Sequence, residues 1–262
     1  MELFVQGFPV FLLIFCRITS FFVVAPVFAA RTVPAKFKVG IGFFVSFLVY
    51  LTYGTTKQIT PNALYMLTLV QEIMVGLLLG FIVYLFFTTV QTAGAFIDLQ
   101  VGFAMANVVD PMTGVSAPIT GNFKYMVLTL LFLTMNGHLY LLQALMNSYR
   151  WIPLEPNLFG YIANGTVTEF LVQAFSQSFL LALQIGAPII VAMFLTDVGL
   201  GFLARTAPQY NVFVIGVPLK ILIGFLLLVL LMPSLGTLFE HLFSFMFDFM
   251  GKFFGALQGA AE

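Results

Sequence analysis

Long apolar blocks, separated by short polar segments, follow one another along the whole chain. A helix needs about 20 residues to cross a hydrocarbon core about 30 Å thick. Most blocks reach that length, whereas the second is marginal and the fifth is too long for one straight crossing. We therefore predict an all-α integral membrane protein with six main apolar blocks, at residues 8–30, 37–54, 63–90, 125–146, 169–204 and 212–233.

A shorter apolar helix is predicted over residues 238–254, after Pro233. Its polar residues recur at every fourth position, which places them on one face of a phenylalanine-rich helix. We expect such an amphipathic helix to lie on a membrane surface or to pack against a partner. The polar residues are Glu240, Ser244, Asp248 and Lys252.

Residues 99–124 interrupt the pattern of membrane-type helices. Pro111 and Pro118 each lack a backbone N–H and clash with a preceding helical turn, and three glycines loosen the rest. The segment is nevertheless apolar, and irregular backbone at membrane depth is tolerated only where it is buried in protein or lines a cavity. We predict a movable plug in a pore, with loop packing without gating as the alternative. The residues assigned to the plug are Phe103, Met105, Val108, Val109, Asp110, Pro111, Met112 and Val115.

The composition supports a membrane protein. Of the 262 residues, 61% are hydrophobic and 8% are charged, too few charged residues to keep the surface of a soluble domain hydrated. The formal net charge is zero, so no excess of basic groups indicates nucleic-acid binding. The single cysteine, Cys16, excludes an intramolecular disulfide.

Five ionisable residues lie within or beside the apolar blocks. Each costs about 2.5–3.5 kcal/mol at the centre of a bilayer on insertion scales, so we do not expect them to face lipid. They either pair with one another and hold helices together, or contact other subunits or a water-filled cavity. A proton relay is a weaker alternative, because a relay needs several acids or histidines along one path. The five are Arg17, Glu72, Asp98, Asp197 and Lys220.

Two further patterns indicate helix packing. Gly76 and Gly80 form a GxxxG motif, which allows a second helix to approach closely. Gln173, Gln177 and Gln184 form a polar seam on the fifth block that suits a subunit interface better than lipid.

No sequence pattern indicates catalysis or a cofactor. His138 and His241 lie far apart, and the chain has no HExxH motif and no cysteine pair for a zinc site. It also has no GxSxG elbow and no phosphate-binding GxxxxGK[ST] loop. We therefore expect neither an enzyme nor a metal-binding protein.

Several stretches resemble the FliR/SctT family of type III secretion export gates. The resemblance covers nearly the whole chain and the order of its blocks. The APQ-x-N stretch at 207–211 is specific to this family and its virulence-injectisome relatives, and residues 215–219 are more similar to the flagellar branch. The similar stretches are VGFA at 101–104, VDP at 109–111, LFLTMNGHL at 131–139 and ARTAPQYNVFVIGVPLK at 204–220.

The resemblance implies one membrane domain over residues 1–262, built of bent helical hairpins that assemble into a helical hetero-oligomeric gate. It implies a location in the bacterial inner membrane, at the flagellar basal body. It also implies that FliP and FliQ are the other gate subunits and that FlhB and FlhA associate with the gate. Unfolded flagellar subunits would pass through the gate, and the family's plug maps to about residues 103–122. One alternative is the injectisome counterpart of the same gate. Another is a stand-alone secondary transporter, which would need a mid-membrane substrate site between repeated halves.

Overall fold

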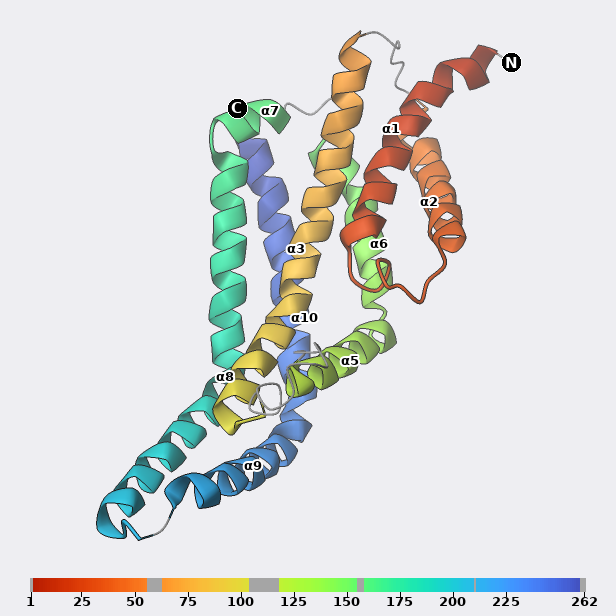
Figure 1. Cartoon of the computed structure of the whole chain (residues 1–262). Helices are drawn as coiled ribbons and strands as arrows, with labels where there is room; N and C mark the ends of the chain where they lie inside the picture. Colours follow the sequence, from red (N-terminus) through yellow and green to blue (C-terminus); the bar gives the residue numbers. More distant parts are fainter. Residues whose placement is uncertain (1, 56–62, 104–117, 155–157, 210, 260–262) are drawn as a thin grey trace. The chain divides into compact units, whose positions relative to one another are not determined.

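The computed structural model describes residues 2–55, 63–103, 118–154, 158–209 and 211–259, and these ranges contain helices and no strand (Figure 1). Helices form because apolar surroundings offer the backbone N–H and C=O groups no water to bind, and a helix satisfies these groups within one segment. The elements are α1 (Glu2–Val24), α2 (Ala35–Val49), the π-helical turn η1 (Tyr50–Gly54), α3 (Ala63–Val101), α5 (Ile119–Thr134), α6 (Gly137–Trp151), α7 (Leu158–Ala163), α8 (Thr166–Thr206), α9 (Val212–Leu231), the 3-10 turn η3 (Met232–Ser234) and α10 (Leu235–Gly259).

Five helical stretches within the described ranges are long and apolar enough to cross a membrane, or up to six if α5 and α6 count as one broken span. The prediction of an all-α, multi-span membrane protein is confirmed. The fifth block forms a helix of 41 residues, α8, with Pro188 inside it. At 1.5 Å per residue it is about 60 Å long, so one straight crossing leaves half of it outside the hydrocarbon core.

The fourth block was expected to form one helix over residues 125–146, but it is not a single straight helix. It consists of α5 and α6, whose axes differ by 70° across a short break. The break falls at Asn136, which adopts a left-handed backbone conformation with φ 58°. Asparagine tolerates this region better than most residues, and Gly137 follows it at the start of α6.

Helix reaches further into the central interruption than we predicted from its prolines and glycines. The third block continues as α3 to Val101, and α5 already begins at Ile119, so residues 119–122 of the expected plug belong to a helix. Pro118 immediately precedes α5, where a missing N–H costs no helical hydrogen bond, and its carbonyl accepts from Asn122 N at 2.9 Å. Residues 104–117 lie outside the described part of the chain.

Helix α10 contains the amphipathic helix expected over residues 238–254, and part of its apolar face packs against α8. The Phe170 ring of α8 lies 4.4 Å from the Phe249 ring and 4.9 Å from the Phe253 ring, centroid to centroid. The polar face remains uncovered within the chain. Its residues Glu240, Ser244, Asp248 and Lys252 are all exposed.

The chain divides into two compact units, each made of stretches that alternate along the sequence. The first comprises Met1–Leu85, Phe132–Phe175 and Phe243–Glu262, and the second comprises Phe86–Leu131 and Ser176–Leu242. Because the stretches alternate, no single cut of the chain separates the units. One domain over residues 1–262 stays a prediction.

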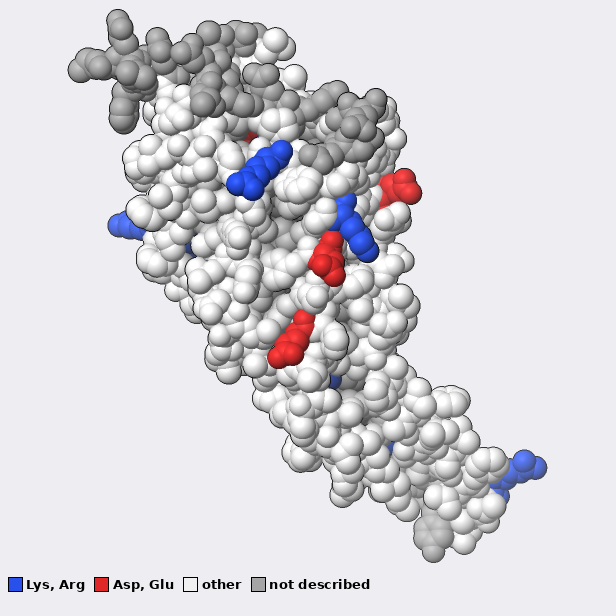
Figure 2. Space-filling view, turned by 180° about the vertical axis from the view of Figure 1, so that it is seen from behind, with Lys and Arg blue, Asp and Glu red and all other residues white. Residues whose placement is uncertain are grey.

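Large apolar side chains are exposed on many helices. Figure 2 shows one face, on which a few charged side chains stand on an otherwise uncharged surface. Helix α9 is the clearest case, since its buried residues are the two glycines Gly216 and Gly224, while Phe213 is 68% exposed and Leu222 is 64% exposed. Such a surface fits lipid or partner subunits better than water.

Candidate functional sites: buried polar contacts between helices

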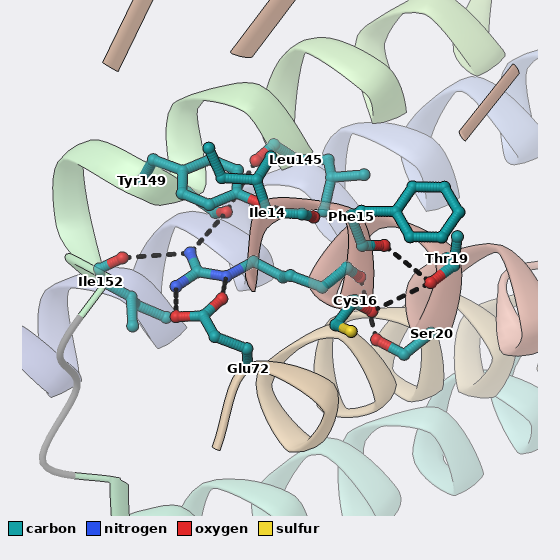
Figure 3. A network of polar contacts seen from close by, with 11 residues as sticks. Ile14, Phe15, Cys16, Thr19, Ser20, Glu72, Leu145, Tyr149 and Ile152 are labelled. Carbon is teal, nitrogen blue, oxygen red and sulfur yellow. Dashed lines mark hydrogen bonds and ion pairs between the residues drawn. The ribbon is translucent and has the colours of Figure 1, made fainter. Parts of the chain in front are cut away.

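In the first unit, Arg17 of α1 and Glu72 of α3 form an ion pair in which neither side chain is exposed (Figure 3). Arg17 Nη2 donates to Glu72 Oε1 at 2.7 Å, and Arg17 Nε donates to Glu72 Oε2 at 2.5 Å. The guanidinium and the carboxylate therefore meet through two hydrogen bonds, the geometry that makes such pairs both strong and specific.

The same guanidinium also binds the end of α6. Arg17 Nη1 donates to Ser148 Oγ at 3.2 Å and to the carbonyl oxygen of Ile152 at 3.0 Å. The Tyr149 ring lies 4.1 Å from Arg17 Cζ (Figure 3). Ile152 is the C-cap of α6, so a cation satisfies a carbonyl at a helix C-terminus. One buried arginine thus joins α1, α3 and α6.

Helices α1 and α3 are in close contact beside this pair. A Cβ atom on Gly76 would overlap the carbonyl oxygen of Arg17 and the hydroxyl of Ser20. A Cβ atom on Gly80 would lie 3.0 Å from Val24 Cβ and 3.1 Å from the carbonyl oxygen of Phe21. The GxxxG motif therefore lies where two helices approach within one chain.

In the second unit, the buried carboxylate of Asp98 lies at the start of α5. The backbone N–H of Thr120 donates to Asp98 Oδ2 at 3.2 Å. The Thr120 hydroxyl donates to Asp98 Oδ1 at 2.5 Å and lies 3.0 Å from the carbonyl oxygen of Gly94. A carboxylate at this position satisfies a free N–H group and is favoured by the helix dipole. Asp98 thus acts as a cap for a helix that lies 22 residues away in sequence.

Next to this cap, α3 and α5 cross with their backbones in contact. A Cβ atom on Gly94 would overlap Gly121 Cα and N, and a Cβ atom on Gly121 would lie 2.8 Å from the carbonyl oxygen of Gln91. The sequence led us to expect that Gly121 loosens an irregular segment. In the structure Gly121 instead lies within α5, where its lack of a side chain lets α3 approach. Thr120 is the residue that the sequence reasoning missed here.

A second ion pair joins α8 to α9. Lys220 Nζ lies 2.8 Å from Asp197 Oδ1 and 3.0 Å from Oδ2, and Gln100 Nε2 of α3 donates to Oδ2 at 3.2 Å. This pair is less buried than the first, because 42% of the Asp197 side chain and 18% of the Lys220 side chain are exposed. Both residues line a hollow of about 420 Å³.

The five ionisable residues chosen from the sequence thus form two ion pairs and one helix cap. Spacing along the chain could not assign these partners, because 55 residues separate Arg17 from Glu72 and 23 separate Asp197 from Lys220. The glutamine seam is partly exposed, and Gln173 Nε2 lies 3.4 Å from Glu169 Oε1 on the same helix.

Of the residues assigned to the plug, the structure describes Phe103. Its side chain packs against a buried cluster of the second unit formed by Ile97, Val101, Ile189 and Met193. Phe103 also lines an apolar pocket of about 340 Å³. The other assigned residues, Met105, Val108, Val109, Asp110, Pro111, Met112 and Val115, lie outside the described part of the chain.

Among the described residues, no group of three histidine, cysteine or acidic side chains is placed to hold a metal ion. Taken together, the fold and the polar contacts define an all-helical, multi-span membrane protein in which five charged residues join separate helices. The chain belongs to the bacterial export proteins, family 1, whose model matches residues 8–246. As a member of this family it is an export component and not an enzyme.

Curated relatives cover most of the chain. It is 40% identical to the flagellar biosynthetic protein FliR of Bacillus subtilis over 86% of each protein. It is 32% identical to the FliR protein of Escherichia coli, over 86% of this chain and 85% of the relative. The Yop proteins translocation protein T of Yersinia pestis is 33% identical over 82% of each protein. The family expected from the sequence is confirmed.

Proposed function

We propose that this chain is a non-catalytic core component of the flagellar type III export gate in the bacterial inner membrane. It forms part of the channel wall with FliP and FliQ, associates with FlhB and FlhA, and lets unfolded flagellar subunits pass. The observation that carries this proposal is the 40% identity to a flagellar biosynthetic protein over 86% of both chains. The exposed apolar surface of α9 supports this proposal, since partner subunits would cover part of that surface.

We further propose that the segment around residues 103–118 plugs the resting channel. Its apolar composition and its prolines support this role, because broken backbone in a membrane protein must be enclosed by protein or line a conduit. Phe103 supports it as well, because its ring packs on a buried apolar cluster and so attaches one end of the segment to the second unit.

We propose two roles in assembly for the charged residues and glycines that lie between helices. Arg17 and Glu72 are fully buried and Asp98 nearly so, so we assign them an indirect role, in which they hold the shape that partners recognise. Asp197 and Lys220 are partly exposed and are therefore available to contact a partner directly. Gly76 and Gly80 belong to the first group, because they pack α3 against α1.

A complementation experiment tests the function. The chain is expressed in a motile bacterium whose own fliR gene is deleted, and swimming and secretion of hook and filament subunits are measured. Restored swimming supports the flagellar assignment. The assignment would be contradicted if the folded chain reached the membrane but restored no secretion, and if its deletion from the native host also left flagellar secretion unchanged.

The plug is tested by deleting residues 105–115 in the complemented strain. We expect the resting membrane to leak ions and small solutes while the chain still co-purifies with FliP and FliQ. Leakage equal to that of the parent strain, together with normal assembly, would remove the plug assignment and leave loop packing as the role of the segment.

The injectisome counterpart remains the second candidate, because the chain is also 33% identical to a Yop translocation protein. The same complementation experiment, repeated in a strain that lacks the injectisome protein, separates the two candidates. Rescue of effector secretion without rescue of swimming would favour the injectisome.

A further inference from the structure

The two ends of the proposed plug segment are held at one place in the second unit. Helix α3 ends at Val101 on the amino side of the segment, and α5 begins at Ile119 on its carboxyl side. Phe103, Ile119 and Thr120 line the same apolar pocket of about 340 Å³, so the two ends lie close together. The chain between them is therefore a closed loop, and residues of α3 and α5 form its base.

Four residues make contact at the base of this loop. The Thr120 hydroxyl donates to Asp98 Oδ1 at 2.5 Å and lies 3.0 Å from the carbonyl oxygen of Gly94, and the Thr120 N–H donates to Asp98 Oδ2 at 3.2 Å. Gly121 lies so close to Gly94 that a Cβ atom on Gly94 would overlap it. Asp98 is 4% exposed and Thr120 is 6% exposed. Buried hydrogen bonds and backbone contact thus fix the first turn of α5 to α3.

The acceptor that caps α5 comes from another helix and not from the residue before it. Pro118 immediately precedes α5, and a proline side chain offers no acceptor to the free N–H groups of the first turn. Asp98 supplies the acceptor from α3, 22 residues away. The cap is therefore lost as soon as α5 leaves α3, so the helix crossing and the first turn of α5 are stable only together.

Unwinding the first turn of α5 would change how far the loop can extend. Each residue adds about 1.5 Å to the length of a helix and about 3.4 Å to that of an extended chain. Release of residues 119–122 therefore adds about 8 Å to the reach of the loop at its carboxyl end. At the amino end, Phe103 packs on the buried cluster of the second unit, so the added length would act on the segment between these two attachments.

We propose that Asp98 and Thr120 form a clasp that sets the reach of the plug segment. The closed clasp keeps the resting gate sealed, and its opening unwinds the first turn of α5 and releases the plug. Lys124, one turn further along α5, supports the closed clasp, because it is 5% exposed and its ammonium group attracts the Asp98 carboxylate. Asp98 and Thr120 are thus positioning residues, which act through the segment attached to them. The inference rests on the proposed plug and names the contact that holds it.

Thr120→Val tests the clasp in the complemented strain. It removes the hydroxyl and preserves the shape of the side chain, whereas Asp98→Ala would leave Lys124 as a buried charge without its counter-charge. We expect the resting leakage of ions and small solutes, per assembled chain, to rise about tenfold, as expected for the loss of one hydrogen bond to a charged group. Recovery of FliP and FliQ with the chain should change less than twofold. Leakage at the parent level from a folded and assembled variant would overturn the proposal.

Three control variants separate the clasp from a general loss of stability. Thr120→Ser retains the hydroxyl and should leak less than twofold above the parent. Thr129→Val removes a hydroxyl that bonds the carbonyl of Tyr125 within α5, and Phe170→Ala removes a ring that packs on Phe249 in the first unit. Neither should raise the leakage per assembled chain. Leakage from any of the three equal to that from Thr120→Val would overturn the proposal, because it would not depend on the hydroxyl at the clasp.

A combination with the plug deletion shows whether the clasp acts through the plug. In a chain that lacks residues 105–115, Thr120→Val should add less than twofold to the leakage, because no plug is left to release. A further tenfold rise would overturn the proposal. The deletion also distinguishes the clasp from the function on which it rests. If the deletion alone causes no leakage, the plug and the clasp fail together. If the deletion leaks and Thr120→Val does not, the clasp alone fails.

Discussion

Arg17 and Glu72 lie 55 residues apart and meet through two hydrogen bonds at a place where neither side chain is exposed. Removing one partner of such a pair leaves the other charge buried and uncompensated, which costs more than the pair itself contributes. The neighbouring contacts of Arg17 with Ser148 and Ile152 are lost together with the pair if the arginine moves.

Glu72→Gln should therefore destabilise the protein strongly. We expect a loss of about 3–5 kcal/mol in the free energy of unfolding, measured by denaturant titration of the purified chain in detergent micelles. The matched control is Glu169→Gln on α8, where the acid is exposed and its neighbour Gln173 lies 3.4 Å away. The control should change stability by less than about 0.5 kcal/mol. Equal effects of the two substitutions would show that the buried pair has no special role.

Gly76→Ala should separate α3 from α1. The added methyl group would overlap the backbone carbonyl of Arg17, which cannot rotate away as a flexible side chain can. We expect a loss of about 1–3 kcal/mol, typical of overpacking, measured in the same titration. Gly40→Ala is the control, because nothing lies within 4 Å of a Cβ atom placed there and an exposed helical position should gain slightly from alanine. An unchanged midpoint for Gly76→Ala would contradict the close packing.

Thr120→Val should loosen the start of α5. It removes the hydroxyl that bonds Asp98 and leaves a buried carboxylate with fewer donors. We expect amide hydrogen exchange in the first turn of α5 to accelerate about tenfold, which corresponds to about 1.4 kcal/mol of local stability, measured by mass spectrometry. The control Thr129→Val removes a hydroxyl that bonds the carbonyl of Tyr125 within its own helix, and should leave that exchange unchanged. Equal exchange in the two variants would mean that Asp98 does not cap α5.

Phe170→Ala should weaken the contact between α8 and α10. Its ring is buried against Phe249 and Phe253, so truncation leaves a cavity between three aromatic side chains. We expect a loss of about 3–5 kcal/mol in the free energy of unfolding. Phe175→Ala on the same helix is the control, since that ring is 62% exposed. A loss at position 175 as large as that at position 170 would indicate that burial of the ring does not determine the effect.

The class of this protein follows from its amino-acid sequence alone. Long apolar blocks and a charge content of 8% leave a membrane as the only solvent in which the helices satisfy both their side chains and their backbone. The sequence also singled out the five charged residues and the GxxxG motif, because a charge or a pair of glycines in an apolar helix is conspicuous without any coordinates.

Which residues contact one another depends on how the helices pack in three dimensions. Periodicity along a helix identifies a face but not the partner of that face, so the pairing of Arg17 with Glu72, and of Asp197 with Lys220, came from the packing of separate helices. The role of Thr120 could not be predicted from the sequence for the same reason. A threonine at this position donates a hydrogen bond to Asp98 only because α5 crosses α3 at Gly94 and Gly121. The prolines and glycines of the middle segment likewise predicted a break, but the helices on either side extend to Val101 and from Ile119, because packing against neighbouring helices outweighs local preference.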